Sequence, residues 1–244
     1  MFHWNEETVG LMRDACEYGG SYHKRLAEIA LQYLPRGRLC DAGCGLGYLS
    51  LALAPFCRSV TACDVSAAAL SVLRSEAEAR RLQNIRILCG DIMNSRPERR
   101  YDGMVFCLFG SFEECMRMSR AQGTGPVVLF MRADRTHRFS IRPAPLRTEP
   151  PETACRRLAV WGVPVRRESL ALEFGQPFRS LESAVRFFTQ YRRDGGEITE
   201  EAVSARLVKT GDAVFPLYLP EKKRLECLCL DTRRIPENAW KEML

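Results

Sequence analysis

The sequence predicts an α/β fold built on a doubly wound, mostly parallel sheet, and two observations support this prediction. First, a short apolar segment, Arg38–Ala42, runs into glycines at every second position (Gly43, Gly45 and Gly47) and then into the helical pattern of residues 48–54. Second, the alternation of strand and helix continues until five such units have followed one another. Successive βα units form parallel sheets with right-handed crossovers, because a right-twisted strand followed by a helix packs back onto the sheet only in that way.

Length and composition predict one domain. The chain has 244 residues, of which 46% are hydrophobic, enough for a full core. We predict a single domain, with an N-terminal helical cap at residues 1–35 and a core at residues 36–244. No apolar run approaches the length of a membrane span, and the first residues lack the basic and then apolar layout of a signal peptide. We therefore expect a cytoplasmic location and no membrane partner.

Cysteine usage and charge restrict the choice of partners. The 11 cysteines are an odd number, lie mostly in apolar strand-like segments and form no CxxC pair. Buried free thiols in a reducing compartment explain this pattern better than disulfides or zinc, so we predict no bound metal. The net charge of +6 permits an anionic partner but does not require one.

Two helices are predicted before the first strand. Residues 5–18 and 21–34 have helical patterns and are separated by Gly19 and Gly20. The pair is an addition to the α/β core, because it precedes the first βα unit.

The glycine turn itself predicts a ligand site. Missing Cβ atoms let a ligand approach the backbone, and the following helix offers free N–H groups. The spacing is G-x-G-x-G, whereas a dinucleotide fingerprint is G-x-G-x-x-G, and Tyr48 stands where its third glycine would be. Asp41 would repel a pyrophosphate but suits a cationic ligand. A nicotinamide oxidoreductase is therefore disfavoured.

The next two strands both end in a carboxylate. Residues 59–64 end at Asp64, about twenty residues after the glycines, which is the separation expected for a carboxylate that binds a ribose diol. Ser66 is suited to cap the helix of residues 67–80. Residues 85–91 form the third strand and end at Asp91.

The fourth and fifth strands lead into an unusual segment. Residues 101–111 are continuously apolar, as in a central parallel strand, and residues 126–131 form the next strand. Residues 132–151 then carry five arginines, His137 and four prolines, which excludes a helix. We predict a substrate loop here. The remaining segments are predicted as a helix at residues 152–161, a strand at residues 165–174 and two helical stretches at residues 180–192 and 197–207. A strand pair or hairpin is predicted at residues 215–219 and 224–231.

The segment from Asp41 to Gly47 resembles motif I, D/E-x-G-x-G-x-G, of the class I (Rossmann-like) S-adenosylmethionine (SAM)-dependent methyltransferases of the small-molecule type. The resemblance extends over residues 36–135. It implies a seven-stranded sheet of order 3-2-1-4-5-7-6 in which strand seven is antiparallel, an N-terminal helical lid, and SAM as the cofactor, with S-adenosylhomocysteine as the product.

The same resemblance assigns cofactor contacts. Asp64 is expected to hold the ribose, Asp91 the adenine amino group and Ile92 the adenine ring, and Cys107 should lie beside the reactive methyl group. By the same resemblance Tyr18 is a lid residue, together with Tyr22 and His23. The predicted cofactor-binding residues are Asp41, Gly43, Cys44, Gly45, Gly47, Asp64, Val65, Asp91, Ile92 and Cys107.

The catalytic residue is not identified by the sequence. The N/D-P-P-Y/F tetrapeptide is missing after the fourth strand, and no Pro-Cys pair makes Cys107 a nucleophile. Asp134 alone does not make a metal-dependent catechol site. If a general base is needed, His23 and His137 are the side chains best suited to it near pH 7, with Tyr22 a third candidate; His3 lies near the terminus.

The sequence therefore predicts an enzyme that moves a methyl group from SAM to a small polar or anionic acceptor by direct in-line transfer. An RNA or protein methyltransferase and a non-catalytic SAM-binding regulator are the alternatives, and a nucleic acid is the less favoured partner. The acceptor atom and the oligomeric state stay open.

Overall fold

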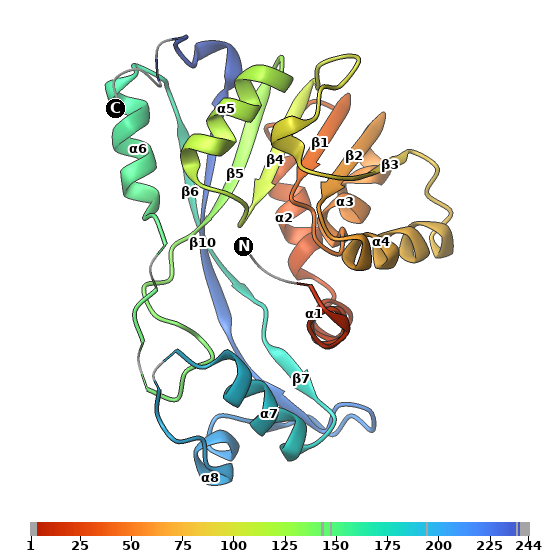
Figure 1. The fold of residues 1–244 in the computed structure, drawn as a ribbon, viewed down its shortest axis with the longest axis vertical. Helices are drawn as coiled ribbons and strands as arrows, with labels where there is room; N and C mark the ends of the chain where they lie inside the picture. The colour runs from red at the N-terminus through yellow and green to blue at the C-terminus, as the bar shows by residue number, and fades with distance from the viewer. Residues whose placement is uncertain (1–3, 143, 147, 194, 238, 240–244) are drawn as a thin grey trace.

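A mixed seven-stranded sheet forms the centre of the protein (Figure 1). The computed structural model describes residues 4–142, 144–146, 148–193, 195–237 and 239. The strand order is β3-β2-β1-β4-β5-β10-β6, and β10 is antiparallel to both of its neighbours, which confirms the predicted order. The strands are β1 (Arg38–Ala42), β2 (Ser59–Asp64), β3 (Ile85–Cys89), β4 (Gly103–Cys107), β5 (Pro126–Arg132), β6 (Arg166–Glu173) and β10 (Lys222–Asp231).

Helices cover both faces of this sheet. Successive strand residues point to opposite faces, so a strand buried on both sides is apolar throughout, as β4 is. One face packs against helices of the first half of the chain, through residues such as Leu26 and Leu53. The other packs against later helices, through residues such as Phe112 and Leu158. The helices are α1 (Glu6–Gly19), α2 (Tyr22–Ala30), α3 (Tyr48–Leu53), α4 (Ala67–Ala79), α5 (Phe112–Gln122) and α6 (Pro151–Val160), with short 3₁₀ turns η1 (Ala54–Phe56), η2 (Ile92–Asn94) and η3 (Thr232–Arg234).

A smaller unit is inserted between β6 and β10, and we call residues 174–221 the inserted lobe. It has its own three-stranded sheet of order β7-β9-β8 and its own core, which includes Phe178, Phe188 and Leu219. In Figure 1 β6 and β10 extend from the main sheet towards this lobe. Its elements are β7 (Gln176–Phe178), α7 (Leu181–Tyr191), α8 (Glu200–Ser204), β8 (Val208–Lys209) and β9 (Leu217–Leu219).

The predicted pairing of residues 215–219 with residues 224–231 is wrong. The first segment is β9, which pairs with β7 and β8, whereas the second is β10, which pairs with β5 and β6. The local pattern identifies both strands, but their hydrogen-bond partners are distant in the sequence. Two strands separated by a short connection therefore resemble a hairpin although they belong to different sheets.

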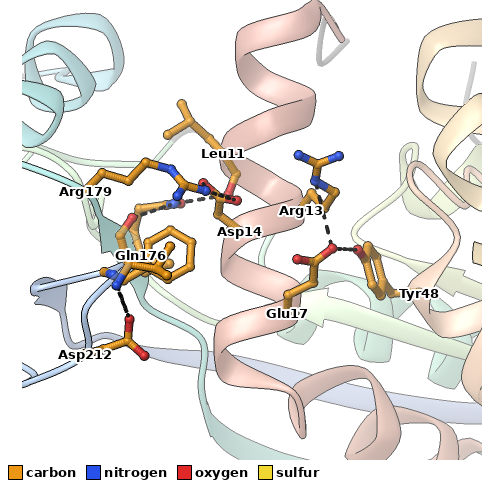
Figure 2. Close-up of polar contacts among 11 residues, drawn as sticks. Leu11, Arg13, Asp14, Glu17, Tyr48, Gln176, Arg179 and Asp212 are labelled. Atoms are coloured by element: carbon orange, nitrogen blue, oxygen red, sulfur yellow. Dashed lines mark hydrogen bonds and ion pairs between the residues drawn. The ribbon is translucent and has the colours of Figure 1, made fainter.

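Helix α1 joins the inserted lobe to the main sheet (Figure 2). On the lobe side, Gln176 Nε2 donates to the Leu11 carbonyl at 3.1 Å and Arg179 pairs with Asp14 at 3.3 Å. On the other side, the Tyr48 hydroxyl, at the start of α3, donates to Glu17 at 3.3 Å. One helix therefore contacts both the lobe and the helix that follows the glycine turn.

Among the described residues, no helix has the length and apolar character needed to cross a membrane.

Candidate active site

The glycine turn after β1 has a backbone that favours glycine at three positions. Gly43, Gly45 and Gly47 have φ angles of 70°, 54° and 75°, in the left-handed region. A Cβ on Gly47 would lie 2.5 Å from Leu73 of α4, so this glycine is needed for packing. The other two glycines have aromatic rings against them instead.

Phe109 and Trp4 lie on the turn. A Cβ on Gly43 would be 1.9 Å from the Phe109 ring, and one on Gly45 would be 2.9 Å from Trp4 Cζ2. Phe109 follows β4 and Trp4 directly precedes the cap of α1, so both side chains are at the carboxyl ends of β1 and β4, where open α/β sheets bind their ligands. Sequence reasoning missed Trp4; its only signal is a large aromatic residue just before a helix cap.

Asp64 ties the turn to the end of β2. One carboxylate oxygen accepts from the Gly45 N–H at 2.9 Å and the other from the Ser66 N–H at 2.9 Å. The side chain is half-buried, so this carboxylate borders the turn. Its position suits a ligand with hydroxyl donors.

Asp41 lies beneath the turn, because its side chain is directed at α3. It is 1% exposed, and the Ser50 hydroxyl donates to it at 2.6 Å. Burial raises the pKa of Asp41 to about 6, against the hydrogen bond from Ser50, and the negative charge of Asp64 raises it further. Asp41 thus supports the turn from within the fold.

The remaining predicted cofactor contacts differ in exposure. Asp91 is exposed and caps η2, accepting from the Met93 N–H at 2.9 Å and from Asn94 Nδ2 at 2.8 Å. Val65 is 51% exposed, whereas Ile92 is 2% exposed and packs in the core. Cys44 is half-buried in the turn.

A group of buried and half-buried aromatic side chains gathers beside the end of β4. Tyr22 and His23 of α2 contact Phe174, with ring centroids 4.3 Å and 5.6 Å apart, and these rings belong to or adjoin the core against which Cys107 packs. Burial raises the pKa of the Cys107 thiol to about 12, so the thiol stays neutral. Burial, with the charge of Lys223, lowers the pKa of His23 to about 3.

Lys223 is the residue of this group that sequence reasoning missed. It is 6% exposed, and its amine lies 5.1 Å from the Tyr22 ring centroid and 4.5 Å from that of Phe174. Burial lowers its pKa to about 7, and the charges of Arg138 and Arg132 lower it further. No pattern in the sequence marks it, because Lys223 lies in the charged run of residues 221–224, outside the predicted strand of residues 224–231.

Two other predicted residues make contacts elsewhere. His137 Nδ1 lies 3.1 Å from the Ser140 hydroxyl, and its ring packs edge-on against Phe139 in the same loop. Tyr18 packs against Tyr218 of the inserted lobe, with centroids 5.0 Å apart. His3 and Arg147 lie outside the described residues. Within the described part of the chain, no three His, Cys, Asp or Glu side chains converge as a metal site would require.

A family model described as a methyltransferase domain matches residues 39–124, which include the glycine turn. Residues 39–124 thus match a methyltransferase domain, and the sheet has the strand order of the class I SAM-dependent methyltransferases. The match and the fold together indicate an enzyme that uses SAM as its cofactor. No curated protein gives a significant sequence match.

Solved structures share the fold of this methyltransferase at low sequence identity. A protein of Bacillus halodurans assigned as a methyltransferase is 15% identical, with a TM-score of 0.53 over 87% of this chain and 99% of that one. The YcgJ protein of Bacillus subtilis is 12% identical, with a TM-score of 0.53 over 85% and 97%. A Pyrococcus horikoshii protein assigned as an RNA methyltransferase is 14% identical, with a TM-score of 0.51 over 86% and 82%.

The residues at the turn of this methyltransferase fit the cofactor. Gly43 and Gly45 form a cradle that a Cβ would fill, and the carboxylate of Asp64 borders it. The rings of Phe109 and Trp4 lie against Gly43 and Gly45, so a ligand bound at this cradle would have to displace them. Trp4 is the ring that belongs to the N-terminal cap.

We expect S-adenosylhomocysteine to slow hydrogen exchange in residues 5–34, mainly in α1. Helix α2 is already held in the core, with Leu26, Ile29 and Ala30 at most 1% exposed. Helix α1 is the part attached to Trp4 and to Tyr48 beside the turn. Exchange measured by mass spectrometry with and without the ligand checks this. Protection confined to residues 43–47 would make the cap a static brace.

Proposed function

We propose that this methyltransferase moves a methyl group from SAM to a small polar or anionic acceptor held beside the end of β4. The observation that carries the proposal is the burial of the side chains in that region. Tyr22, Phe174 and Lys223 are 4%, 4% and 6% exposed, and Tyr22 and Phe174 pack in one core cluster with Ala15 and Cys16 of α1. An enclosed, largely aromatic site favours a small molecule over a polymer.

The cofactor would be held by the turn and by two carboxylates. Gly43 and Gly45 would contact it through their backbone, Asp64 would accept from the ribose hydroxyls, and Asp91 would accept from the adenine amino group. SAM supplies an electrophilic methyl group when bound. The protein then has to hold the acceptor in line with that group and keep water out.

Neither His23 nor Tyr22 has the pKa expected of a general base near neutral pH. The lowered pKa of His23 keeps its imidazole unprotonated near neutral pH but also makes it a weak base. Tyr22 has a pKa raised well above its usual value by burial, so its hydroxyl keeps its proton. We therefore propose that Tyr22 and His23 position the acceptor.

Two arginines of residues 132–151 also support a small acceptor, because they are engaged within the protein. Arg138 donates to the Phe174 carbonyl at 2.9 Å, and Arg135 pairs with Glu152 at 2.9 Å. Arg206 of the inserted lobe donates to the carbonyls of Arg138 and Ser140, which holds the loop in place. Side chains engaged in this way are poorly suited to follow a nucleic-acid backbone.

Methyl transfer from tritium-labelled SAM tests the proposal. The enzyme is incubated with pools of small carboxylates and phosphates, with tRNA, duplex RNA and DNA, and with protein. We expect label in the small-molecule fraction alone. Label in RNA, with binding that weakens by a log–log salt slope near −0.9 per duplex phosphate neutralised, would make the protein an RNA methyltransferase. S-adenosylhomocysteine binding without transfer to any pool would indicate a regulator.

Asp64→Ala is expected to weaken S-adenosylhomocysteine binding by roughly 1–3 kcal/mol, because charge-assisted hydrogen bonds to the ribose are lost. Asp91→Ala should cost less, since one hydrogen bond to the adenine is at stake. Calorimetric titration measures both. Asp212→Ala is the control, because Asp212 also accepts from backbone N–H groups in a turn, but in the inserted lobe. Wild-type affinity for Asp64→Ala would make Asp64 only a support of the turn.

A further inference from the structure

Lys223 is a buried amine without a counter-ion. It makes no ion pair and no hydrogen bond with any residue that the structure describes, and its contacts are the faces of the Tyr22 and Phe174 rings. A buried ammonium is costly unless it is paired, so lysines in such positions usually have a partner. The strongest charges acting on Lys223 are those of Arg138 and Arg132, which are of the same sign.

The Tyr22 hydroxyl is a second polar group without a partner. Tyr22 is 4% exposed, and its oxygen has no hydrogen bond within the described residues. A buried phenol normally finds a partner, because the desolvated O–H is otherwise unsatisfied. The ring of this tyrosine is the one that lies under the Lys223 amine, so the two unsatisfied groups are close together.

Arg132 adds a third cation to the same place. It is the last residue of β5, is half-buried, and its guanidinium makes no ion pair or hydrogen bond with the described part of the chain. Its charge lowers the pKa of both Tyr22 and Lys223, as expected of a near neighbour. Arg138 also lowers the pKa of Tyr22 and of Lys223. Unlike Arg132, it donates a hydrogen bond to the Phe174 carbonyl, and the negative charges of Glu221 and Asp134 offset its own.

Strand register places this group at the edge where ligands bind. Leu225 of β10 is opposite Arg132, so Lys223 is two residues beyond the end of β5 and on the same face as Leu225. Leu225 belongs to the core against which Cys107 packs at the end of β4. The group therefore borders the acceptor side of the proposed active site.

We infer that Lys223, Arg132 and Tyr22 form a binding subsite for a carboxylate or phosphate group of the methyl acceptor. An anion supplies the missing partner for all three: a charge for the ammonium and the guanidinium, and an acceptor for the phenol. The inference rests on the proposed function and narrows its acceptor to a small anion. The same three side chains would also suit the carboxylate in the methionine part of the cofactor. The experiments below separate an anion of the acceptor from this carboxylate of the cofactor.

The test uses calorimetry with inorganic phosphate and benzoate as probes, added to enzyme saturated with S-adenosylhomocysteine. We expect the wild type to bind at least one probe, Lys223→Met to bind it at least tenfold more weakly, and Tyr22→Phe several-fold more weakly. Lys222→Met removes the same charge from an exposed neighbour and should bind like the wild type. Melting curves establish that each variant is folded.

A second titration compares S-adenosylhomocysteine with methylthioadenosine, which lacks the carboxylate. If Lys223→Met lowers the affinity for S-adenosylhomocysteine but not for methylthioadenosine, the subsite binds the cofactor carboxylate and the inference is overturned. It is also overturned if the wild type binds neither probe, or if Lys223→Met binds them normally. Failure of S-adenosylhomocysteine to bind the wild type would instead contradict cofactor binding, separately from the subsite.

Benzoate affinity should also fall as the pH rises through about 7, because Lys223 then loses its proton. The other groups facing it keep their charge there. Arginine side chains do not lose their proton in proteins. Tyr22, Cys16 and Cys107 have raised pKa values, and His23 is already neutral. Lys223→Met should show a flat profile, and a wild-type profile that stays flat would contradict the role of the ammonium.

Discussion

Gly45→Val is expected to lower the affinity for S-adenosylhomocysteine by at least about 100-fold, equivalent to about 3 kcal/mol. The valine side chain would occupy the cradle, and its Cβ would start 2.9 Å from Trp4. The backbone at this position has a φ of 54°, which a β-branched residue adopts only with strain. Calorimetric titration measures the affinity, and circular dichroism establishes that the fold persists.

Gly162→Val is the matched control for backbone strain. Its φ is 67°, and nothing lies within 4 Å of the Cβ position, so it carries the strain without a neighbouring ligand. We expect this variant to lose some stability and to bind S-adenosylhomocysteine normally. Equal losses of affinity in both variants, or normal binding by Gly45→Val, would show that the turn does not contact the cofactor.

Lys223→Met is expected to stabilise the ligand-free protein by about 1–3 kcal/mol near pH 6, because an apolar side chain of similar size replaces a buried charge. The melting temperature should rise by about 2–4 °C per kcal/mol for a chain of this size. Lys222→Met, on the exposed side of the same strand, should change stability little.

The pH dependence of this gain follows from the pKa of Lys223, lowered from 10.5 to about 7 on folding. Below pH 7 both states hold the proton, so the wild type bears the full cost of the buried charge. Above pH 7 the unfolded state binds a proton that the folded state does not, and wild-type stability rises with pH. The advantage of Lys223→Met should therefore shrink as the pH rises towards 10.5. Denaturant unfolding at several pH values measures it, and a variant less stable than the wild type at pH 6 would contradict this account.

The sequence predicts those parts of the site that are close together along the chain. The glycine turn, Asp41 and Asp64 are local features of the first two βα units, so their spacing alone indicates their arrangement. Lys223 comes near Tyr22 only because β10 enters the sheet beside β5, across most of the chain. Trp4 reaches Gly45 in the same non-local way. Such contacts depend on tertiary packing, which cannot be predicted from the local residue pattern of a single sequence.

The inserted lobe escaped prediction for a different reason. Its strands β7 and β8 span three and two residues, too few for a period-two pattern to stand out. The helical stretches within it were recognised, because an amphipathic helix such as α7 repeats its pattern over eleven residues. Strands this short are recognised by the strands they pair with, not by their own amino-acid pattern.

The place of β10 between β5 and β6 has a consequence for synthesis on the ribosome. Strands β1 to β5 can pair with one another as each emerges, but β6 has no neighbour in the sheet until the whole inserted lobe and β10 have followed it. During that interval β6 is an open strand with Leu170 and Leu172 uncovered, the kind of edge that pairs with other chains. Insertion of β10 between β5 and β6 is thus the last step in completing the sheet.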